Sequence, residues 1–240
     1  AWHSRVLPRP AAGDAAAVGL ARGFVVQFLE TFLAFFRKAH IGKVLAFLLL
    51  YRIAEAQLVK LAAPFLLDDR AVGGLGLETG EVGFVYGTVG MIMLTIGGLA
   101  GGFLAARNGL RYWLWWMVAA INLPNAVYIL LAWLQPDSFL AINIAVGVEQ
   151  FGYGFGFTAY TLYMIYVARG EHSTAHFAIC TGFMALGMML PGMVSGAIQE
   201  WLGYQQFFIW VLLATSPSFL IVALLPLDPA FGRKDATGAP

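Results

Sequence analysis

The sequence has few charged residues and a single cysteine. Asp, Glu, Lys and Arg make up 11% of the 240 residues, whereas a soluble domain normally carries about 25% charged residues. So few charges cannot cover a globule in water, which indicates that lipid is the solvent. Cys180 has no partner for an internal disulfide, and no cysteine spacing is typical of a zinc site. The net charge of +1, with no basic stripe, gives no indication of nucleic-acid binding.

Enzyme signatures are missing as well. The sequence has no glycine loop followed by Lys-Ser/Thr, no Gly-x-Ser-x-Gly and no His-Glu-x-x-His. His172 and His176 lie four residues apart, but no third metal ligand accompanies them. We therefore expect no enzyme, no cofactor and no metal site, and the chain by itself is not an ATP-driven pump.

Apolar residues, in contrast, make up 60% of the chain, and the mean hydropathy is +0.76. An α-helix needs about 20 apolar residues to cross the roughly 30 Å of hydrocarbon in a bilayer. Six segments meet that length, with short polar breaks between them. The sequence therefore predicts an all-α membrane protein with six transmembrane helices, at 43–66, 82–105, 112–134, 138–167, 175–199 and 207–225.

The ends of the chain differ from this region. Residues 1–42 are expected to form a cytoplasmic linker, in which residues 20–40 carry Phe24, Phe28, Phe32 and Phe36 at intervals of four. This pattern is typical of an amphipathic helix at the membrane surface, although a short soluble helix against a partner domain would read the same way. We expect the six-helix bundle over residues 43–226 and a disordered cytoplasmic tail over residues 227–240.

Basic residues in the loops predict the orientation. Arg and Lys precede the first segment and follow the second, fourth and sixth, whereas the alternate loops are mostly acidic, with Arg70 as their one strong base. Cytoplasmic loops carry the excess of Lys and Arg, so both termini are expected in the cytoplasm. An even number of spans requires the same arrangement.

Polar residues inside the expected spans indicate a functional site. Arg52 and Glu55 are three residues apart on the first span and can pair, and Glu149 and Gln150 lie on the fourth. One ionised residue at the centre of a spanning helix costs roughly 2.5–3.5 kcal/mol. We therefore expect such residues to have a structural or functional role. The pair is either a structural lock between helices or part of an aqueous cavity that binds substrate or protons. Burial raises the pKa of a carboxyl group, whereas a nearby arginine lowers it. The competition between these two effects makes a usable proton switch.

Glycine is frequent in the second, fourth and fifth spans. Small residues four apart let helix backbones approach closely, either as static packing or as a surface on which helices slide. Pro124 and Pro191 are expected to kink their helices. Three glycine-rich spans with two prolines favour a protein that moves. The expected conformational and packing residues are Gly87, Gly90, Gly97, Gly101 and Pro191.

At this point the order of motifs resembles a known family. The segment 50–56, Glu81-Val82-Gly83, the run from Gly97 to Arg107, the run from Glu149 to Gly156, and 173–178 are similar to the C-terminal half of AmpG-type muropeptide permeases. These belong to the peptide–acetyl-CoA transporter family within the major facilitator superfamily. Arg52 and Glu55 stand where that pattern has Lys and Asp.

The resemblance implies a proton-coupled importer of muropeptide, or a related solute, in the bacterial inner membrane. It adds Arg107 to the conformational residues and makes Arg52, Glu55, Glu149 and Gln150 the substrate- and proton-binding residues. The family fold has twelve spans, with substrate bound between two halves. The implied partners are therefore the solute, protons, lipid and an N-terminal six-helix half. A non-transporting membrane module and a half-transporter acting as a homodimer remain open.

Overall fold

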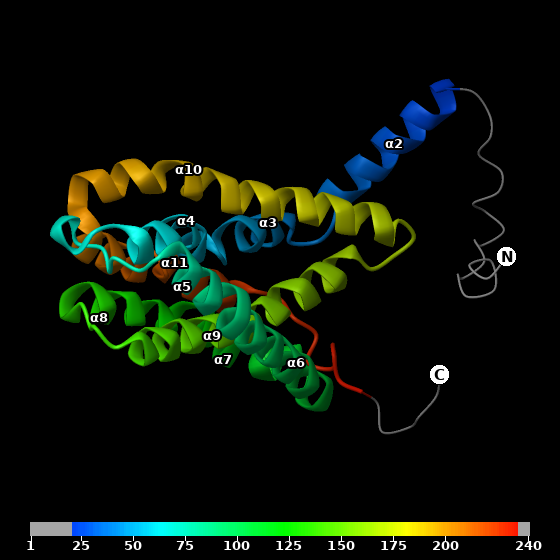
Figure 1. Ribbon diagram of the computed structural model, residues 1–240. Helices are drawn as coiled ribbons and strands as arrows, with labels where there is room; N and C mark the ends of the chain where they lie inside the picture. Colours follow the sequence, from blue (N-terminus) through cyan, green and yellow to red (C-terminus); the bar gives the residue numbers. More distant parts are fainter. Residues whose placement is uncertain (1–20, 235–240) are drawn as a thin grey trace, which may run out of the picture. The chain divides into compact units, whose positions relative to one another are not determined.

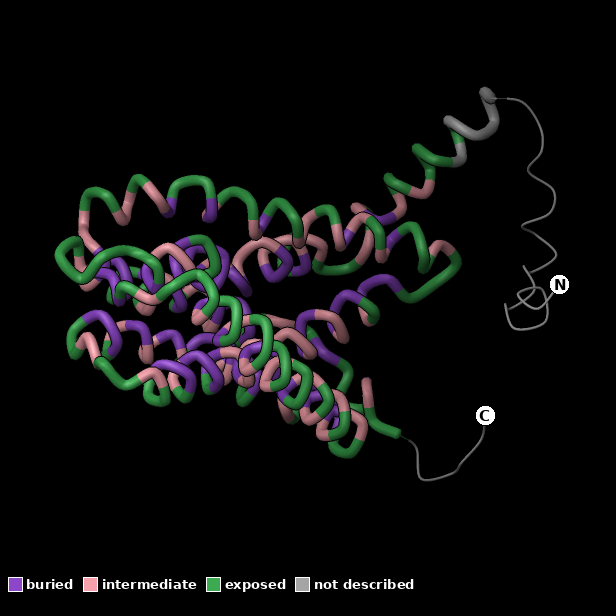
Figure 2. Tube along the Cα trace, viewed as in Figure 1, coloured by how far each residue is buried: buried purple, intermediate pink, exposed green. Residues whose placement is uncertain are grey.

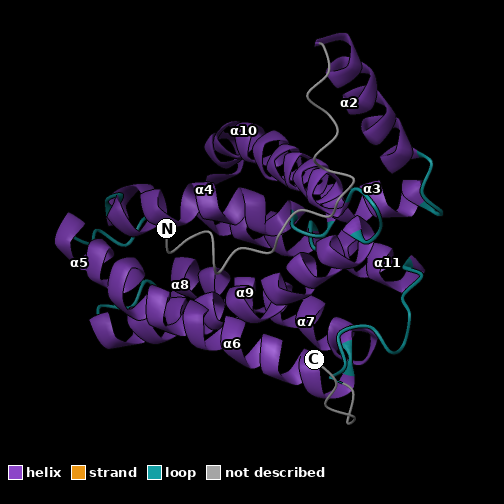
Figure 3. Cartoon of the chain, turned by 90° about the vertical axis from the view of Figure 1, so that its right-hand side faces the viewer, coloured by secondary structure: helices purple, strands orange, loops and turns teal. Residues whose placement is uncertain are grey.

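The structure is a computed structural model that describes residues 21–234, apart from the side chains of residues 21–25 and 27. The chain separates into two compact units, residues 1–41 and 42–240, and each is described by itself. Throughout the described part the secondary structure is helix joined by short turns, without strands (Figure 3). The expected arm at residues 1–19 lies outside the described residues, and so does the side chain of Phe24.

The described part of the first unit is helix α2, Ala21–Phe36. Its phenylalanines follow one face, since the rings of Phe28 and Phe32 are 6.2 Å apart and those of Phe32 and Phe36 are 5.0 Å apart. This agrees with the spacing by four along a helix. The position of α2 at a membrane surface stays a prediction.

The second unit is a bundle of helices in which every expected span is mostly helical (Figure 1). A short 3₁₀ turn, Arg70–Val72, follows the first expected span, and η3 is a π-helical segment that joins α5 to α6. The bounds are α3 Ile41–Leu50, α4 Ile53–Leu67, α5 Thr79–Phe84, η3 Val85–Gly90, α6 Met91–Asn108, α7 Leu110–Asn122, η4 Leu123–Asn125, α8 Ala126–Leu134, α9 Phe139–Ala168, α10 Ser173–Leu213 and α11 Ser216–Leu224.

Three helical stretches in the described part are long and apolar enough to cross a membrane, namely Thr79–Asn108, Leu110–Leu134 and Ser173–Leu224. The last of them is not straight. Gly203 has φ 73° and ψ 165°, a left-handed backbone that glycine adopts without a steric penalty. The chain turns back there, so that the end of α10 and α11 run in the opposite direction to the first part of α10 (Figure 1). The protein is thus all-helical with long apolar helices, and the count of six spans stays a prediction.

Buried and exposed residues lie in different parts of the bundle. Exposed stretches recur along α6 and the first part of α10, and buried stretches gather where α4, α8 and α9 approach one another (Figure 2). Large apolar side chains on the outer surface are exposed, among them Leu99, which is 71% exposed, and Trp201, which is 84% exposed. Such a surface suits lipid rather than water.

Glycine sets the contact between α6 and α9. A Cβ atom at Gly97 would collide with the backbone carbonyl oxygen of Phe151, and one at Gly101 would lie 2.8 Å from the Thr158 hydroxyl oxygen. On the other helix, a Cβ atom at Gly154 would collide with the carbonyl oxygen of Leu94. The two backbones therefore touch, as small residues allow in membrane helices.

We expect Gly97→Ala to destabilise the bundle by about 1–3 kcal/mol, because the added methyl group must push α6 away from the α9 backbone. Gly102→Ala, on the same helix, is the matched control, since nothing lies within 4 Å of a Cβ atom there. The control should be neutral or stabilising by up to about 1 kcal/mol, because alanine is the better helix former. Thermal unfolding in detergent measures both, and equal melting temperatures for the two variants would contradict the packing role of Gly97.

The described part of the C-terminal segment differs from the expected disordered tail. Over residues 227–234 the backbone NH of Lys234 donates to the carbonyl of Ala106, and the NH of Leu110 donates to the carbonyl of Phe231. The ring of Phe231 lies 4.9 Å from that of Tyr166 and is 6% exposed. The segment is thus held by the Phe231 ring against Tyr166 and by the hydrogen bond to the Ala106 carbonyl near the end of α6. Its polar composition does not reveal these contacts.

Candidate functional site

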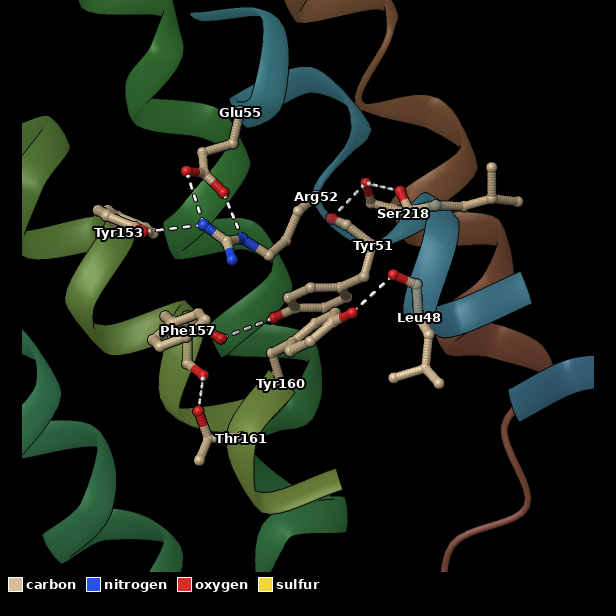
Figure 4. A network of polar contacts seen from close by, with 11 residues as sticks. Leu48, Tyr51, Arg52, Glu55, Tyr153, Phe157, Tyr160, Thr161 and Ser218 are labelled. Carbon is tan, nitrogen blue, oxygen red and sulfur yellow. Dashed lines mark hydrogen bonds and ion pairs between the residues drawn. The ribbon is translucent and has the colours of Figure 1, made fainter. Parts of the chain in front are cut away.

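The site begins at a break between α3 and α4. The backbone of Arg52 has φ −113° and ψ 17°, so the helix is interrupted near the middle of the first expected span. The Tyr160 hydroxyl on α9 donates to the carbonyl of Leu48 at 2.6 Å, and the Ser218 hydroxyl on α11 donates to the carbonyl of Tyr51 at 2.9 Å (Figure 4). A free carbonyl in hydrocarbon costs several kcal/mol. These two side chains therefore make the break possible.

The break directs Arg52 into the bundle, where it forms the expected ion pair. Arg52 Nε and a terminal guanidinium nitrogen donate to the two carboxylate oxygens of Glu55 at 2.5 and 2.9 Å. The same terminal nitrogen lies 2.8 Å from the Tyr153 hydroxyl on α9, and the guanidinium carbon lies 4.7 Å from the ring centre of Phe157 (Figure 4). Arg52 is 6% exposed and Glu55 is 1% exposed. A bidentate, charge-assisted pair of hydrogen bonds of this kind fixes both side chains in one geometry.

The other two predicted residues face the same space. Glu149 on α9 is 4% exposed and accepts a hydrogen bond from the side-chain amide of Gln150 at 2.9 Å. Glu149 takes part in no ion pair within residues 21–234. Glu55, Glu149 and Gln150 all line one cavity of about 310 Å³. The structure thus brings together the four residues that the sequence singled out.

The sequence did not single out the tyrosines that complete this cavity. Tyr86 and Tyr128 line its wall, and their hydroxyl oxygens are 2.5 Å apart. Tyr86 lies in η3, which is wound as a π-helix, and such segments recur at functional sites in helices. Tyr128 lies one turn into α8 and is fully buried. Nothing in the local sequence distinguishes these tyrosines from packing residues, because only the crossing of two distant helices pairs them.

The predicted conformational residues separate into two groups. Gly90, Gly97 and Gly101 lie at close contacts, and a Cβ atom at Gly90 would be 3.3 Å from the side chain of Gln150 in the cavity wall. Gly87 does not lie at such a contact, since nothing in the described part is within 4 Å of a Cβ atom there. Gly87 lies in the π-helical segment η3, and its conformational role stays a prediction.

The remaining two, Arg107 and Pro191, do not line the cavity. Arg107 is exposed in the last turn of α6, and α10 remains helical through Pro191. Residues 21–234 contain no group of three side chains placed to hold a metal ion. What the cavity offers is the Glu55 carboxylate fixed by its ion pair, a separate carboxyl group, an amide and three phenols, a set of groups that can bind a polar solute.

No family model matches the chain, but curated proteins do. It is 26% identical over 200 residues to a Rickettsia prowazekii protein named as transporter AmpG 2, a match that covers 83% of this chain and 47% of that protein. It is 27% identical over 188 residues to the anhydromuropeptide permease of Escherichia coli, covering 78% of this chain and 37% of that protein. The chain therefore spans less than half the length of these relatives. The resemblance to AmpG-type transporters is confirmed, and the relatives are named as transporters and permeases, not as enzymes.

Proposed function

We propose that this chain forms one wall of the solute pathway in a secondary transporter of the major facilitator superfamily. The observation that carries the proposal is the cavity, in which Glu55, paired with the buried Arg52 at a mid-helix break, and the separate carboxyl group of Glu149 face one space. Discontinuous helices at membrane depth form substrate and ion sites in many secondary transporters. Intramembrane ionisable groups mark such pathways.

In this proposal the six helical segments between residues 41 and 224 are six spans of the bacterial inner membrane, with both termini in the cytoplasm. They form the C-terminal half of a twelve-span transporter, and an N-terminal six-helix half closes the cavity. The relatives, which are more than twice the length of the matched region, support this arrangement over a homodimer of six-span chains. The backbone contacts between α6 and α9 would move as a unit while the two halves rock.

The solute in this proposal is an anhydromuropeptide or a close relative, imported together with protons. The name of the Escherichia coli relative supports the solute, and Glu149 supports proton coupling. Arg52 and Glu55 then bind polar groups of the solute, together with Gln150.

The test is uptake of labelled anhydromuropeptide into membrane vesicles that contain the full-length protein. With an acidic exterior, we expect accumulation of up to about tenfold per unit of pH difference for one proton per solute, since one pH unit stores about 1.4 kcal/mol. A protonophore should abolish the accumulation, and vesicles without the protein are the control. No accumulation with the gradient present would refute the proposed import, and a non-transporting membrane module would then be the better reading.

A further inference from the structure

A second charged residue on α4, Lys60, belongs neither to the ion pair nor to the cavity wall described above. Lys60 is exposed and lies five residues after Glu55, which is about 7.5 Å farther along the helix axis. Within the described part of the chain no ion pair involves Lys60. It is seven residues from the end of α4 at Leu67, or about 10 Å. A cation at this depth has a large free-energy cost unless an anion or water meets it.

Lys60 borders a cavity of its own. About 550 Å³ of space lies between α4 and α10 at this point, and Lys60 lines it together with Met188, Met189 and Met193. A Cβ atom at Gly192 would be 3.2 Å from both Cγ and Cε of Lys60. The missing side chain at Gly192 therefore leaves room for the lysine stem against α10. Methionine side chains are flexible and adapt to ligands of different shape.

This space adjoins the central cavity. Val59 and Met188 line both, so a solute held near Glu55 can extend past them to Lys60. The charges of the two spaces differ. In the central cavity the charge of Arg52 is neutralised by Glu55, and the residues that line that cavity include no lysine or arginine. Among the described residues that line the two spaces, Lys60 is thus the cation that remains available to an anionic group.

We propose that Lys60 is an anion subsite that binds a carboxylate of the solute whose polar groups occupy the central cavity. The inference rests on the proposed function, because it assigns one end of the same solute. A carboxylate can also come from an acidic side chain in a part of the transporter outside this chain. The two sources differ in a measurable way, since only the first makes the effect of Lys60 depend on the solute.

The test uses two probes, an anhydromuropeptide with free peptide carboxylates and the same compound with those carboxylates converted to carboxamides. Binding to the full-length protein in detergent is measured as the ligand-induced shift in melting temperature, and uptake is measured in proteoliposomes. Lys60→Gln should weaken binding and uptake of the acid probe at least about tenfold, as expected for loss of a charge-assisted contact, and leave the carboxamide unaffected. Lys60→Arg should retain the preference for the acid. Lys43→Gln, at an exposed lysine on α3, is the matched control.

Equal losses for both probes would overturn the subsite and assign Lys60 to a contact within the protein. No loss for either probe would also overturn it. If the unmodified protein transports neither probe, the proposed function fails, but the binding measurement still decides the subsite. Binding of the acid that depends on Lys60 would support the subsite even then, and absence of any such binding would refute it.

Discussion

Replacing Glu149 with glutamine should abolish proton-driven accumulation of the solute while leaving solute exchange largely intact. Glutamine has almost the same shape and can keep a hydrogen bond to Gln150, which lies 2.9 Å from the carboxylate. It cannot bind or release a proton, however. If Glu149 carries the coupling proton, accumulation should fall from up to about tenfold per unit of pH difference to none, because the gradient no longer drives the solute. Exchange of labelled for unlabelled solute needs no net proton movement and should continue.

Uptake driven by an imposed pH gradient and exchange at equal pH on both sides measure these two quantities in the same vesicles. Glu200→Gln is the matched control, because Glu200 is an exposed carboxylate on α10 and its replacement should change neither rate. Full retention of uphill uptake in Glu149→Gln would rule out the coupling role. Equal loss of both rates would instead show that Glu149 binds the solute or holds the fold.

The Arg52–Glu55 pair should respond differently to single and double substitution. Glu55→Gln leaves the Arg52 guanidinium buried without its carboxylate, and Arg52→Gln leaves a buried carboxylate without its cation. Removing one partner of a buried pair typically costs about 3–5 kcal/mol, whereas replacing both partners can be close to neutral. We therefore expect each single variant to unfold at a clearly lower temperature, and the double variant to regain most of the lost stability.

Transport then separates the two roles that the sequence left open. If the pair only locks α4 to α9 through Tyr153, the double variant should recover uptake along with stability. If Arg52 and Glu55 bind the solute, the double variant should be stable yet inactive, which is the outcome we expect. Thermal unfolding and uptake of the same four proteins decide between these roles, and recovery of both quantities together would refute solute binding.

Several features of the fold were predictable because they depend on residues close together in the chain. Long apolar segments must be helical in a bilayer, since a helix satisfies its own backbone hydrogen bonds. Arg52 and Glu55 can pair because residues three apart share a helix face. The close approach of α6 to α9 follows the glycine pattern in the same way. The residues of the candidate site were selected on the cost of charge in an apolar segment, which is also a local property.

Other features depend on contacts between distant segments. No glycine or proline lies beside the helix break at Tyr51 and Arg52, so the local sequence does not predict it. The break is stabilised by hydrogen bonds from Tyr160 and Ser218, which are more than a hundred residues away in the chain. The meeting of Tyr86 with Tyr128 requires the π-helical winding of η3 and the crossing of two helices. The position of Lys60 beside Gly192 was likewise invisible in the sequence, where Lys60 is one more charge on the first span.

The sequence by itself thus determined that this is an all-helical membrane protein with charged groups placed inside its apolar helices. Composition, segment length and spacing within one helix are sufficient for that conclusion. In lipid, few backbone structures other than the helix satisfy their own hydrogen bonds. Only the tertiary structure decided that Glu55, Glu149 and Gln150 line one cavity, with Arg52 paired to Glu55 beside it, and that no described atom lies within 4 Å of a Cβ atom at Gly87. The same structure placed Lys60 beside a second space next to that cavity. Which faces meet depends on helix breaks and crossings stabilised by side chains far apart in the chain, and no local pattern encodes them.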